Sequence, residues 1–132
     1  MKTLILTLIA IFSITAVAPA QKPEKLIVRV GQQKTAPASR IAVKFVAVTE
    51  DSRCPQGVNC IWAGVATIKI QLRKNGKPAR EFELNTNQLD KSITFEGHEI
   101  KLFALTPYPR SGEGPIKQGA YSAALTITRL RK

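Results

Sequence analysis

The fold of this chain is decided by the stretch Ala66-Thr67-Ile68-Lys69-Ile70-Gln71-Leu72-Arg73, in which apolar and polar residues alternate at every position. Successive side chains of a β-strand point to opposite faces of the sheet, so the apolar set lies on one face and the polar set on the other. The pattern predicts a long strand within Ile61–Arg73, with one face in a core and one face in solvent.

The segment Pro78–Leu84 is predicted to pair with this strand, because it also alternates apolar and acidic residues. A two-residue turn at Asn75-Gly76 would place Ile70 opposite Glu81 and bring charge onto the apolar face. A three-residue loop, with Gly76 as a left-handed bulge, moves the register by one residue and avoids this conflict. The predicted register places Ile68 opposite Phe82, Ala66 opposite Leu84, and Lys69 opposite Glu81.

Period-two patterning continues through most of the chain, without a convincing helical period. Further strands are predicted at Leu26–Val30, Arg40–Thr49, Ser92–Phe95, Glu99–Leu105 and Ala120–Leu130. About seven strands with turn signals at short intervals indicate an all-β fold, an antiparallel β-sandwich of the immunoglobulin-like type. A small Greek-key β-barrel is the alternative.

The N-terminus has the three parts of a secretory signal peptide. Met1-Lys2 is basic, Leu4–Val17 is apolar but too short for a comfortable membrane span, and Ala18-Pro19-Ala20 ends in small residues. We expect cleavage after Ala20, a single domain at 21–132, and a periplasmic or secreted location.

Two cysteines, Cys54 and Cys60, lie close together, and export to an oxidising compartment predicts a disulfide between them. In the structural interpretation, the disulfide pins the connection between two central strands. Trp62 then fills a core position beside it, and Gly64 lets the backbone bend. Asp51 or Ser52 caps a turn through the nearby backbone.

Three functional interpretations compete at the same segment. An exposed Arg53 beside the disulfide could enter the pocket of a trypsin-like enzyme, as in a secreted protease inhibitor. Redox exchange is disfavoured because the cysteine spacing is not C-x-x-C. Two cysteines and the single histidine, His98, fall short of a tetrahedral metal set, so no metal or cofactor is expected.

The loop 106–119 is the second candidate binding segment. Prolines stiffen it around Tyr108 and Arg110, which belong to residue types that often anchor interfaces. The alternative is that Tyr108 folds back onto the rim of the sandwich. Tyr121 resembles the tyrosine corner of immunoglobulin-like domains, in which the hydroxyl bonds to a nearby backbone group.

The formal net charge of +11 favours an anionic partner. The densest positive patch is the predicted hairpin, with Lys69, Arg73, Lys74, Lys77 and Arg80. Its only aromatic residue, Phe82, faces the core in the predicted register, so stacking on nucleic-acid bases is not expected. A simply solvated hairpin tip is the alternative.

No catalytic residues are predicted, since His98 is expected in an exposed turn and no nucleophile motif is present. The sequence therefore favours an exported, non-enzymatic binding or structural module that acts through loop 50–60 or loop 106–119. Its expected partner is an anionic envelope component or a secreted protein. The alternatives are the protease inhibitor, and a hydrolase or redox protein without a known motif.

The block EDSRCPQGVNCIWAG (50–64), together with LTPYP (105–109) and YSAALTIT (121–128), resembles a group of small, uncharacterised exported bacterial proteins, many of them lipoproteins. The resemblance covers nearly all of 21–132, and its specific part is the cysteine–tryptophan block. It implies a β-sandwich-like fold and an envelope or extracellular location, but no activity or functional residue. Lipid-anchored members carry a cysteine at the cleavage site, and this chain has none there.

Overall fold

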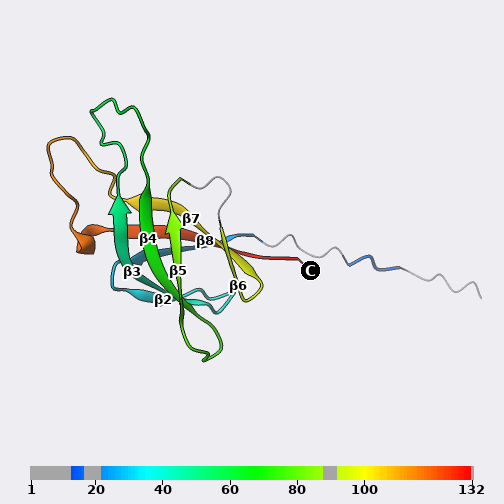
Figure 1. Ribbon diagram of the computed structural model, residues 1–132. Helices are drawn as coiled ribbons and strands as arrows, with labels where there is room; N and C mark the ends of the chain where they lie inside the picture. The colour runs from blue at the N-terminus through cyan, green and yellow to red at the C-terminus, as the bar shows by residue number, and fades with distance from the viewer. Residues whose placement is uncertain (1–12, 17–21, 88–91, 132) are drawn as a thin grey trace, which may run out of the picture.

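Two antiparallel sheets of four strands each pack face to face in the computed structural model, which describes residues 13–16, 22–87 and 92–131 (Figure 1). One sheet has the order β1-β8-β7-β6 and the other β2-β3-β4-β5. The strands are β1 (Glu24–Arg29), β2 (Gln33–Thr35), β3 (Ala42–Asp51), β4 (Ala66–Arg73), β5 (Arg80–Asn85), β6 (Ile93–Phe95), β7 (His98–Thr106) and β8 (Ser122–Arg129). The predicted β-sandwich is confirmed, with eight strands in the described residues.

The core follows from the alternation that the sequence displays. On β4, Ala66, Ile68, Ile70 and Leu72 are all buried, and on β8 the apolar set Ala123, Leu125 and Ile127 is buried against them. The largest fully buried side chain is Phe45 of β3. Each isoleucine, leucine or phenylalanine side chain removed from water contributes roughly 1.5–3 kcal/mol, which makes this interior the main source of stability.

The predicted β4–β5 register is wrong, although the predicted faces are right. Asn75 (φ 55°) and Gly76 (φ 69°) form a two-residue turn, and the Lys77 N–H donates to the Lys74 carbonyl at 3.2 Å. That turn alone would place Leu72 opposite Ala79, but Leu72 pairs with Arg80. One extra residue therefore lies between the turn and β5 and is left out of the pairing. The observed partners are Ile70 with Phe82, Ile68 with Leu84, and Lys69 with Glu83.

Two long loops project from the same end of the sandwich (Figure 1). The first joins β3 to β4, and because β4 begins only at Ala66, the prediction that the strand extends back to Ile61 is wrong. The second joins β7 to β8 and contains the short 3-10 helix η1 (Gln118–Ala120), where no helix was expected. The β4–β5 hairpin lies at the opposite end.

The predicted signal peptide lies largely outside the described residues, which include only 13–16 of it. Within the described part of the chain, no helix is long and apolar enough to cross a membrane.

Candidate functional site

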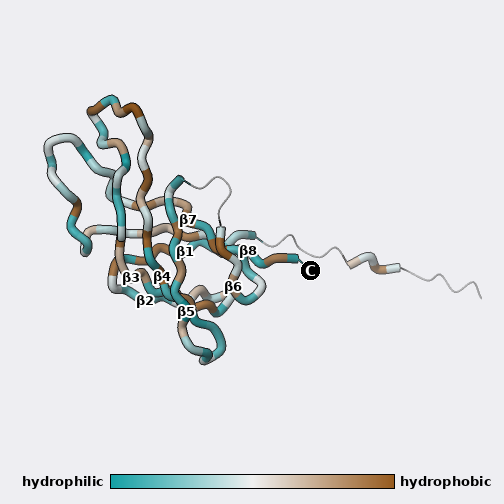
Figure 2. The backbone as a smooth tube through the Cα atoms, in the orientation of Figure 1, coloured by the Kyte–Doolittle hydropathy of each residue, from teal (hydrophilic) through white to brown (hydrophobic). Residues whose placement is uncertain are grey.

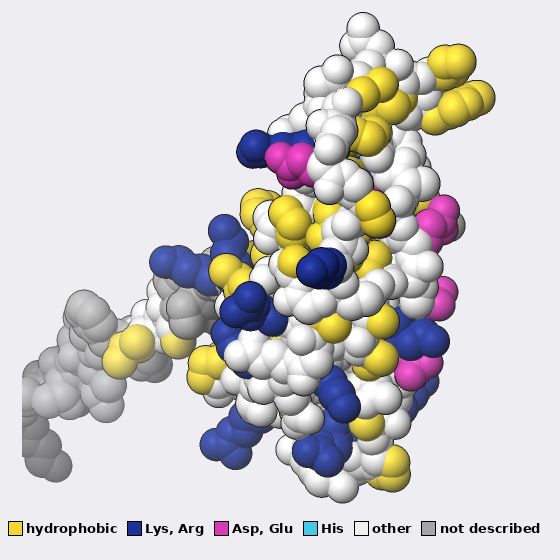
Figure 3. Space-filling view, turned by 90° about the vertical axis from the view of Figure 1, so that its left-hand side faces the viewer, with side chains coloured by type: hydrophobic (Ala, Val, Ile, Leu, Met, Phe, Trp, Pro, Cys, Tyr) yellow, Lys and Arg dark blue, Asp and Glu magenta, His cyan; other side chains and the backbone are white. Residues whose placement is uncertain are grey.

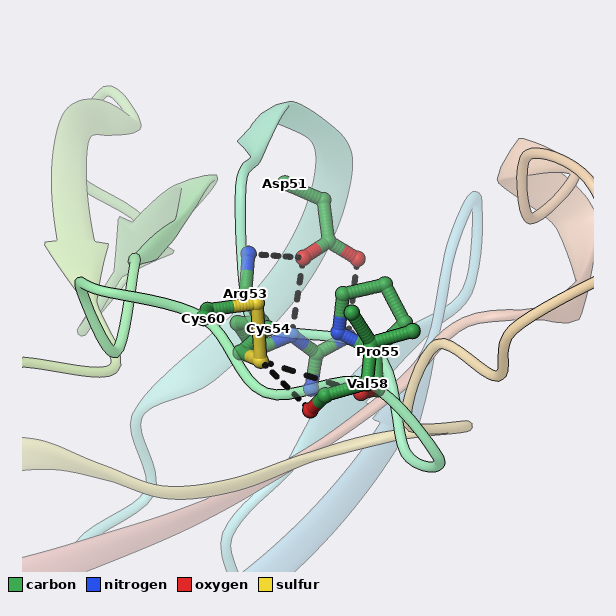
Figure 4. Close-up of a disulfide and its surroundings, with 6 residues drawn as sticks. All are labelled: Asp51, Arg53, Cys54, Pro55, Val58 and Cys60. Carbon is green, nitrogen blue, oxygen red and sulfur yellow. Dashed lines mark hydrogen bonds and ion pairs between the residues drawn. A yellow bond between two sulfur atoms is a disulfide. The ribbon is translucent and has the colours of Figure 1, made fainter.

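An ion pair stands at the base of the two projecting loops. Asp51 is the last residue of β3, and Arg53 follows two residues later. The Arg53 Nε donates to Asp51 Oδ1 at 2.8 Å and Nη2 donates to Oδ2 at 2.8 Å, a bidentate arrangement (Figure 4). The Arg53 backbone N–H also donates to Asp51 Oδ1 at 3.3 Å. The predicted turn capped by Asp51 is therefore confirmed.

Arg53 reaches across to the other sheet. Its Nη1 donates to the Leu105 carbonyl at 2.8 Å and its Nη2 to the Pro107 carbonyl at 3.0 Å. The Tyr108 ring lies 4.8 Å from the guanidinium carbon, a cation–π distance. Arg53 is only 7% exposed, so the prediction of an exposed arginine that enters a protease pocket is wrong. Tyr108 packs its ring on the Arg53 guanidinium, as in the predicted alternative, but the side chain remains 42% exposed.

Tyr121, directly before β8, completes this group. Its side chain is buried, and its hydroxyl donates to Asp51 Oδ2 at 2.7 Å. The tyrosine-corner interpretation predicts a hydrogen bond from the Tyr121 hydroxyl to a nearby backbone group, and this prediction is wrong. The acceptor is a carboxylate 70 residues earlier in the chain. We call Asp51, Arg53 and Tyr121 the buried charge cluster; Tyr108, which is 42% exposed, covers it from the outside.

The cluster fixes the charge states of its members. Burial alone would raise the pKa of Asp51, but the hydrogen bonds from Arg53 and Tyr121 and the guanidinium charge hold that pKa below its usual value. Burial and the hydrogen bond to Asp51 raise the pKa of Tyr121 to about 12. Burial lowers the pKa of Arg53, yet the Asp51 carboxylate outweighs it and raises that pKa. The cluster thus holds a permanent ion pair whose groups already bond to one another.

The disulfide loop is built on this base. Cys54 and Cys60 form the predicted disulfide, with their Cα atoms 5.9 Å apart (Figure 4). The Cys54 N–H donates to the Ala63 carbonyl at 3.1 Å, which closes the loop above the disulfide. Gly64 has a positive φ of 69°, and a Cβ there would overlap the Ser52 carbonyl. The predicted structural role of Gly64 is confirmed.

The two candidate loops touch each other. The Gln56 N–H donates to the Pro109 carbonyl at 2.9 Å, and the Ser111 N–H donates to the Gln56 carbonyl at 3.0 Å. The second loop is tied to β3 by Gln118, whose side-chain amide bonds to both backbone groups of Val48 at 2.8 and 2.9 Å. Loops 50–60 and 106–119, weighed as alternatives from the sequence, therefore form one supported unit. Arg110 lies exposed within it.

Trp62 does not fill a core position, and that prediction is wrong. It is 81% exposed, and its neighbour Ile61 is 93% exposed. Val58, inside the disulfide loop, is 48% exposed. The chain has left the sheet at this point, and the buried charge cluster occupies the space at the base of the loop. We call Val58, Ile61 and Trp62 the apolar tip; Figure 2 shows hydrophobic stretches on this projecting loop.

A pocket of about 360 Å³ lies beside the apolar tip. Its lining is mainly apolar and comes from the disulfide loop, from β7, from the second loop and from the polar residues Thr86 and Asn87, which follow β5. The lining includes Ala63, Gly64, Leu102, Phe103, Leu105 and Tyr108, with Arg53 at its base. Phe103 is 65% exposed at a bulge of β7, so an aromatic ring stands at the pocket wall.

The basic patch of the hairpin lies at the other end of the sandwich. Lys69 pairs with Glu81 at 3.3 Å, Lys77 pairs with Glu96 at 3.7 Å, and the Arg80 guanidinium lies 5.3 Å from the Phe82 ring. Phe82 packs against the core, as predicted. Arg73 and Lys74 complete this patch, which we call the basic hairpin. Figure 3 shows Lys and Arg spread over the middle and lower parts of one face, and hydrophobic side chains that project at its upper end.

His98 is not the exposed turn residue that the sequence indicated. It is buried, and its Nδ1 lies 2.8 Å from the Glu96 carbonyl in the β6–β7 turn. It pairs with Arg129 at the end of β8, whereas Tyr121 precedes the start of that strand. The histidine and the buried charge cluster are therefore separated by the length of β8.

Comparisons with protein-family models, with curated proteins and with solved structures gave no match to this chain. The site is thus defined by its own geometry. Sequence reasoning missed Val58 and Ile61 as candidate contact residues. A signal was present, because the run 54–64 contains no charged residue in a chain that is 22% charged.

Proposed function

We propose that the protein is an exported, non-enzymatic binding module that contacts its partner through the apolar tip. The observation that carries the proposal is the exposure of Trp62 and Ile61, at 81% and 93%, on a loop that is closed by a disulfide. Large apolar side chains exposed together are typical of interaction surfaces. Tryptophan is among the residue types that contribute most to binding when buried at an interface.

The support beneath the tip favours binding over a passive loop. The disulfide, the hydrogen bonds between Gln56 and the second loop, and the anchoring of Arg53 all restrict the loop before any partner arrives. A restricted loop loses less conformational entropy on binding, so more of the contact energy remains as affinity. Export is supported by the N-terminal leader pattern and by the disulfide, which belongs to oxidising compartments.

The protease-inhibitor alternative loses the residue on which it depended, because Arg53 is buried and fully engaged. The buried charge cluster also gives little support to catalysis. Both Asp51 oxygens already accept hydrogen bonds from Arg53, and Tyr121 donates to one of them. The contact surface that remains is the tip itself.

Photo-crosslinking tests the proposal. A photoreactive amino acid replaces Ile61 in one variant and Ile27 in another, and both variants are irradiated in the intact exporting cell. Ile27 is a matched control because it is an isoleucine, 59% exposed, on β1 of the sandwich body. We expect discrete adducts from position 61 and none from position 27. Absence of adducts from position 61 would contradict the proposed contact surface.

A further inference from the structure

The apolar tip and the pocket lie next to each other at one end of the molecule. Trp62 is directly followed in the chain by Ala63 and Gly64, which line the pocket. Consecutive Cα atoms are about 3.8 Å apart, so the backbone of Trp62 lies at the edge of the pocket, although its side chain is not part of the lining. This end of the molecule therefore presents an exposed apolar side chain, Trp62 (the knob), beside a mainly apolar pocket (the hole).

We infer that this end of the molecule docks onto the same end of a second copy, with Trp62 of each copy entering the other's pocket. The inference rests on the proposed function, because it names the partner of the apolar tip. In a two-fold symmetric pair, every contact between residue i and residue j occurs twice. A knob beside a hole satisfies this symmetry, since a single rotation brings both knobs to both holes.

The size and lining of the pocket fit an indole ring. Its volume of about 360 Å³ lies within the range of about 300–1,000 Å³ that is usual for sites that hold small organic groups. Tyr108 and Phe103 line it, and aromatic rings favour edge-to-face or offset contacts with another aromatic ring. The occupied pocket would bury the most exposed aromatic residue of the described chain.

The placement of charge sets how a second copy can approach. Two chains with a formal net charge of +11 repel each other, and the repulsion is lowest when their charged ends are far apart. The run 54–64 is uncharged, and the basic hairpin lies at the opposite end of the sandwich (Figure 1). Contact through the apolar tips directs the two basic hairpins outward.

An anionic lipid surface is a weaker candidate on the same ground. Screening limits electrostatic attraction to about 10 Å at 0.1 M salt. A lipid surface would therefore attract the basic hairpin, which is the end farthest from the tip. The attraction would turn the apolar tip away from the surface and not toward it.

The expected dimer is weak. A buried aromatic side chain contributes about 150–250 Å², and the tip adds two aliphatic side chains to this. A standard interface buries about 800 Å² on each partner, which the tip and the pocket rim do not reach. We therefore expect dissociation on the order of tens of micromolar or weaker.

Two measurements on one concentration series of the purified protein, from micromolar to millimolar, test the inference. Sedimentation should show the average mass rising toward that of two chains. Trp62 is the only tryptophan, so its fluorescence should shift to shorter wavelength with the same midpoint as it leaves water. The midpoint should stay the same or move to lower protein concentration in high salt, because salt screens the repulsion between copies.

A pair of matched variants assigns the interface. Ile61→Asp retains Trp62 as the reporter and should remain a single chain with unshifted emission at every concentration. Ile27→Asp places the same charge on β1 and should associate like the unchanged protein. Circular dichroism of both variants checks that the sandwich is intact.

The outcomes separate this inference from the proposed function. A constant single-chain mass with unshifted Trp62 emission would overturn the second-copy inference. If anionic vesicles then shift the emission, the occupant is lipid; if photo-crosslinks from position 61 join another protein, the occupant is that protein. Either result overturns the inference and keeps the apolar tip as the contact surface. Loss of all crosslinks from position 61 would remove the proposed function as well.

Discussion

At the residue scale, the buried charge cluster is the least replaceable part of the molecule. Removing a charge from water is costly unless close partners replace its hydration, and Asp51 and Arg53 supply such partners to each other. Their side chains are only 12% and 5% exposed. Tyr121 and two backbone carbonyls accept or donate further bonds, but none of them carries a balancing charge, so deletion of Asp51 or Arg53 leaves the other charge buried without a counter-ion.

Substitution Arg53→Met should therefore destabilise the fold by about 3 kcal/mol, because it leaves the Asp51 carboxylate uncompensated. Urea unfolding at neutral pH measures this loss. Arg110→Met is the control, since Arg110 is an exposed arginine in the neighbouring loop and its loss should cost less than about 0.5 kcal/mol. Equal unfolding midpoints for the two variants would show that the ion pair adds nothing to stability.

The hydroxyl of Tyr121 should couple stability to pH at both extremes. The pKa of Asp51 in the folded state lies below its ordinary value of 3.8. The stability that the ionised Asp51 contributes is therefore fully present above pH 3.8 and is lost as the pH falls through the folded-state pKa. The folded-state pKa of Tyr121 is about 12 against an ordinary 10.0, so its contribution is complete below 10.0 and disappears as the pH rises toward 12. Tyr121→Phe should raise the pH of acid unfolding and weaken the loss of stability between 10 and 12. Unchanged acid unfolding would show that Tyr121 does not sustain the Asp51 carboxylate.

At the element scale, the loop between β3 and β4 depends on one backbone position. Gly64 and Gly76 have the same φ of 69°, but they differ in what surrounds them. A Cβ at Gly64 would overlap the Ser52 carbonyl, whereas nothing lies within 4 Å of a Cβ at Gly76. The two glycines therefore separate the cost of a left-handed conformation from the cost of a steric clash.

Gly76→Ala should cost about 1 kcal/mol, the strain of a side chain in the left-handed region. Gly64→Ala carries the same strain, and the Ser52 backbone must also move, so we expect a loss of at least about 3 kcal/mol. Thermal unfolding of the two variants, measured in parallel, gives the comparison. Similar losses would mean that the Ser52 carbonyl yields easily and that the loop base is not rigid.

The strand faces could be predicted from the sequence, but the pairing and the tip could not. Alternation fixes which side of β4 is buried. The observed β4–β5 register differs from the predicted one by two residues, so that Ile68 pairs with Leu84 and not with Phe82. Because a shift of two residues keeps every side chain on its face, apolar residues still pair with apolar residues. Trp62 was expected inside because it is large and apolar. At the base of this loop the buried residue is Arg53, whose bonds reach carbonyls 52 and 54 residues away, and no local pattern shows such contacts.

At the scale of the whole molecule, charge and apolar surface are separated along the sandwich. The uncharged tip precedes β4, whereas the basic hairpin begins at Lys69 in the middle of that strand and continues through the turn to Arg80 at the start of β5. Within the basic hairpin, Lys69 and Lys77 have acidic partners, but these pairs are partly exposed and contribute little to holding the side chains in place. The hairpin can therefore turn its lysines toward an external anion while the opposite end is engaged in a different contact.

This separation predicts which lysines govern binding to an anionic polymer. The double variant Lys74→Ala, Lys77→Ala should elute from a heparin column at lower salt than the unchanged protein, with the slope of log affinity against log salt reduced by about 1–2. The control Lys44→Ala, Lys117→Ala removes the same charge from β3 and from the second loop, where both lysines are exposed. If the basic hairpin is a local binding surface, the control should elute close to the unchanged protein. If the two double variants elute together, retention reflects net charge alone, since a diffuse field depends on how many charges are present and not on where they lie.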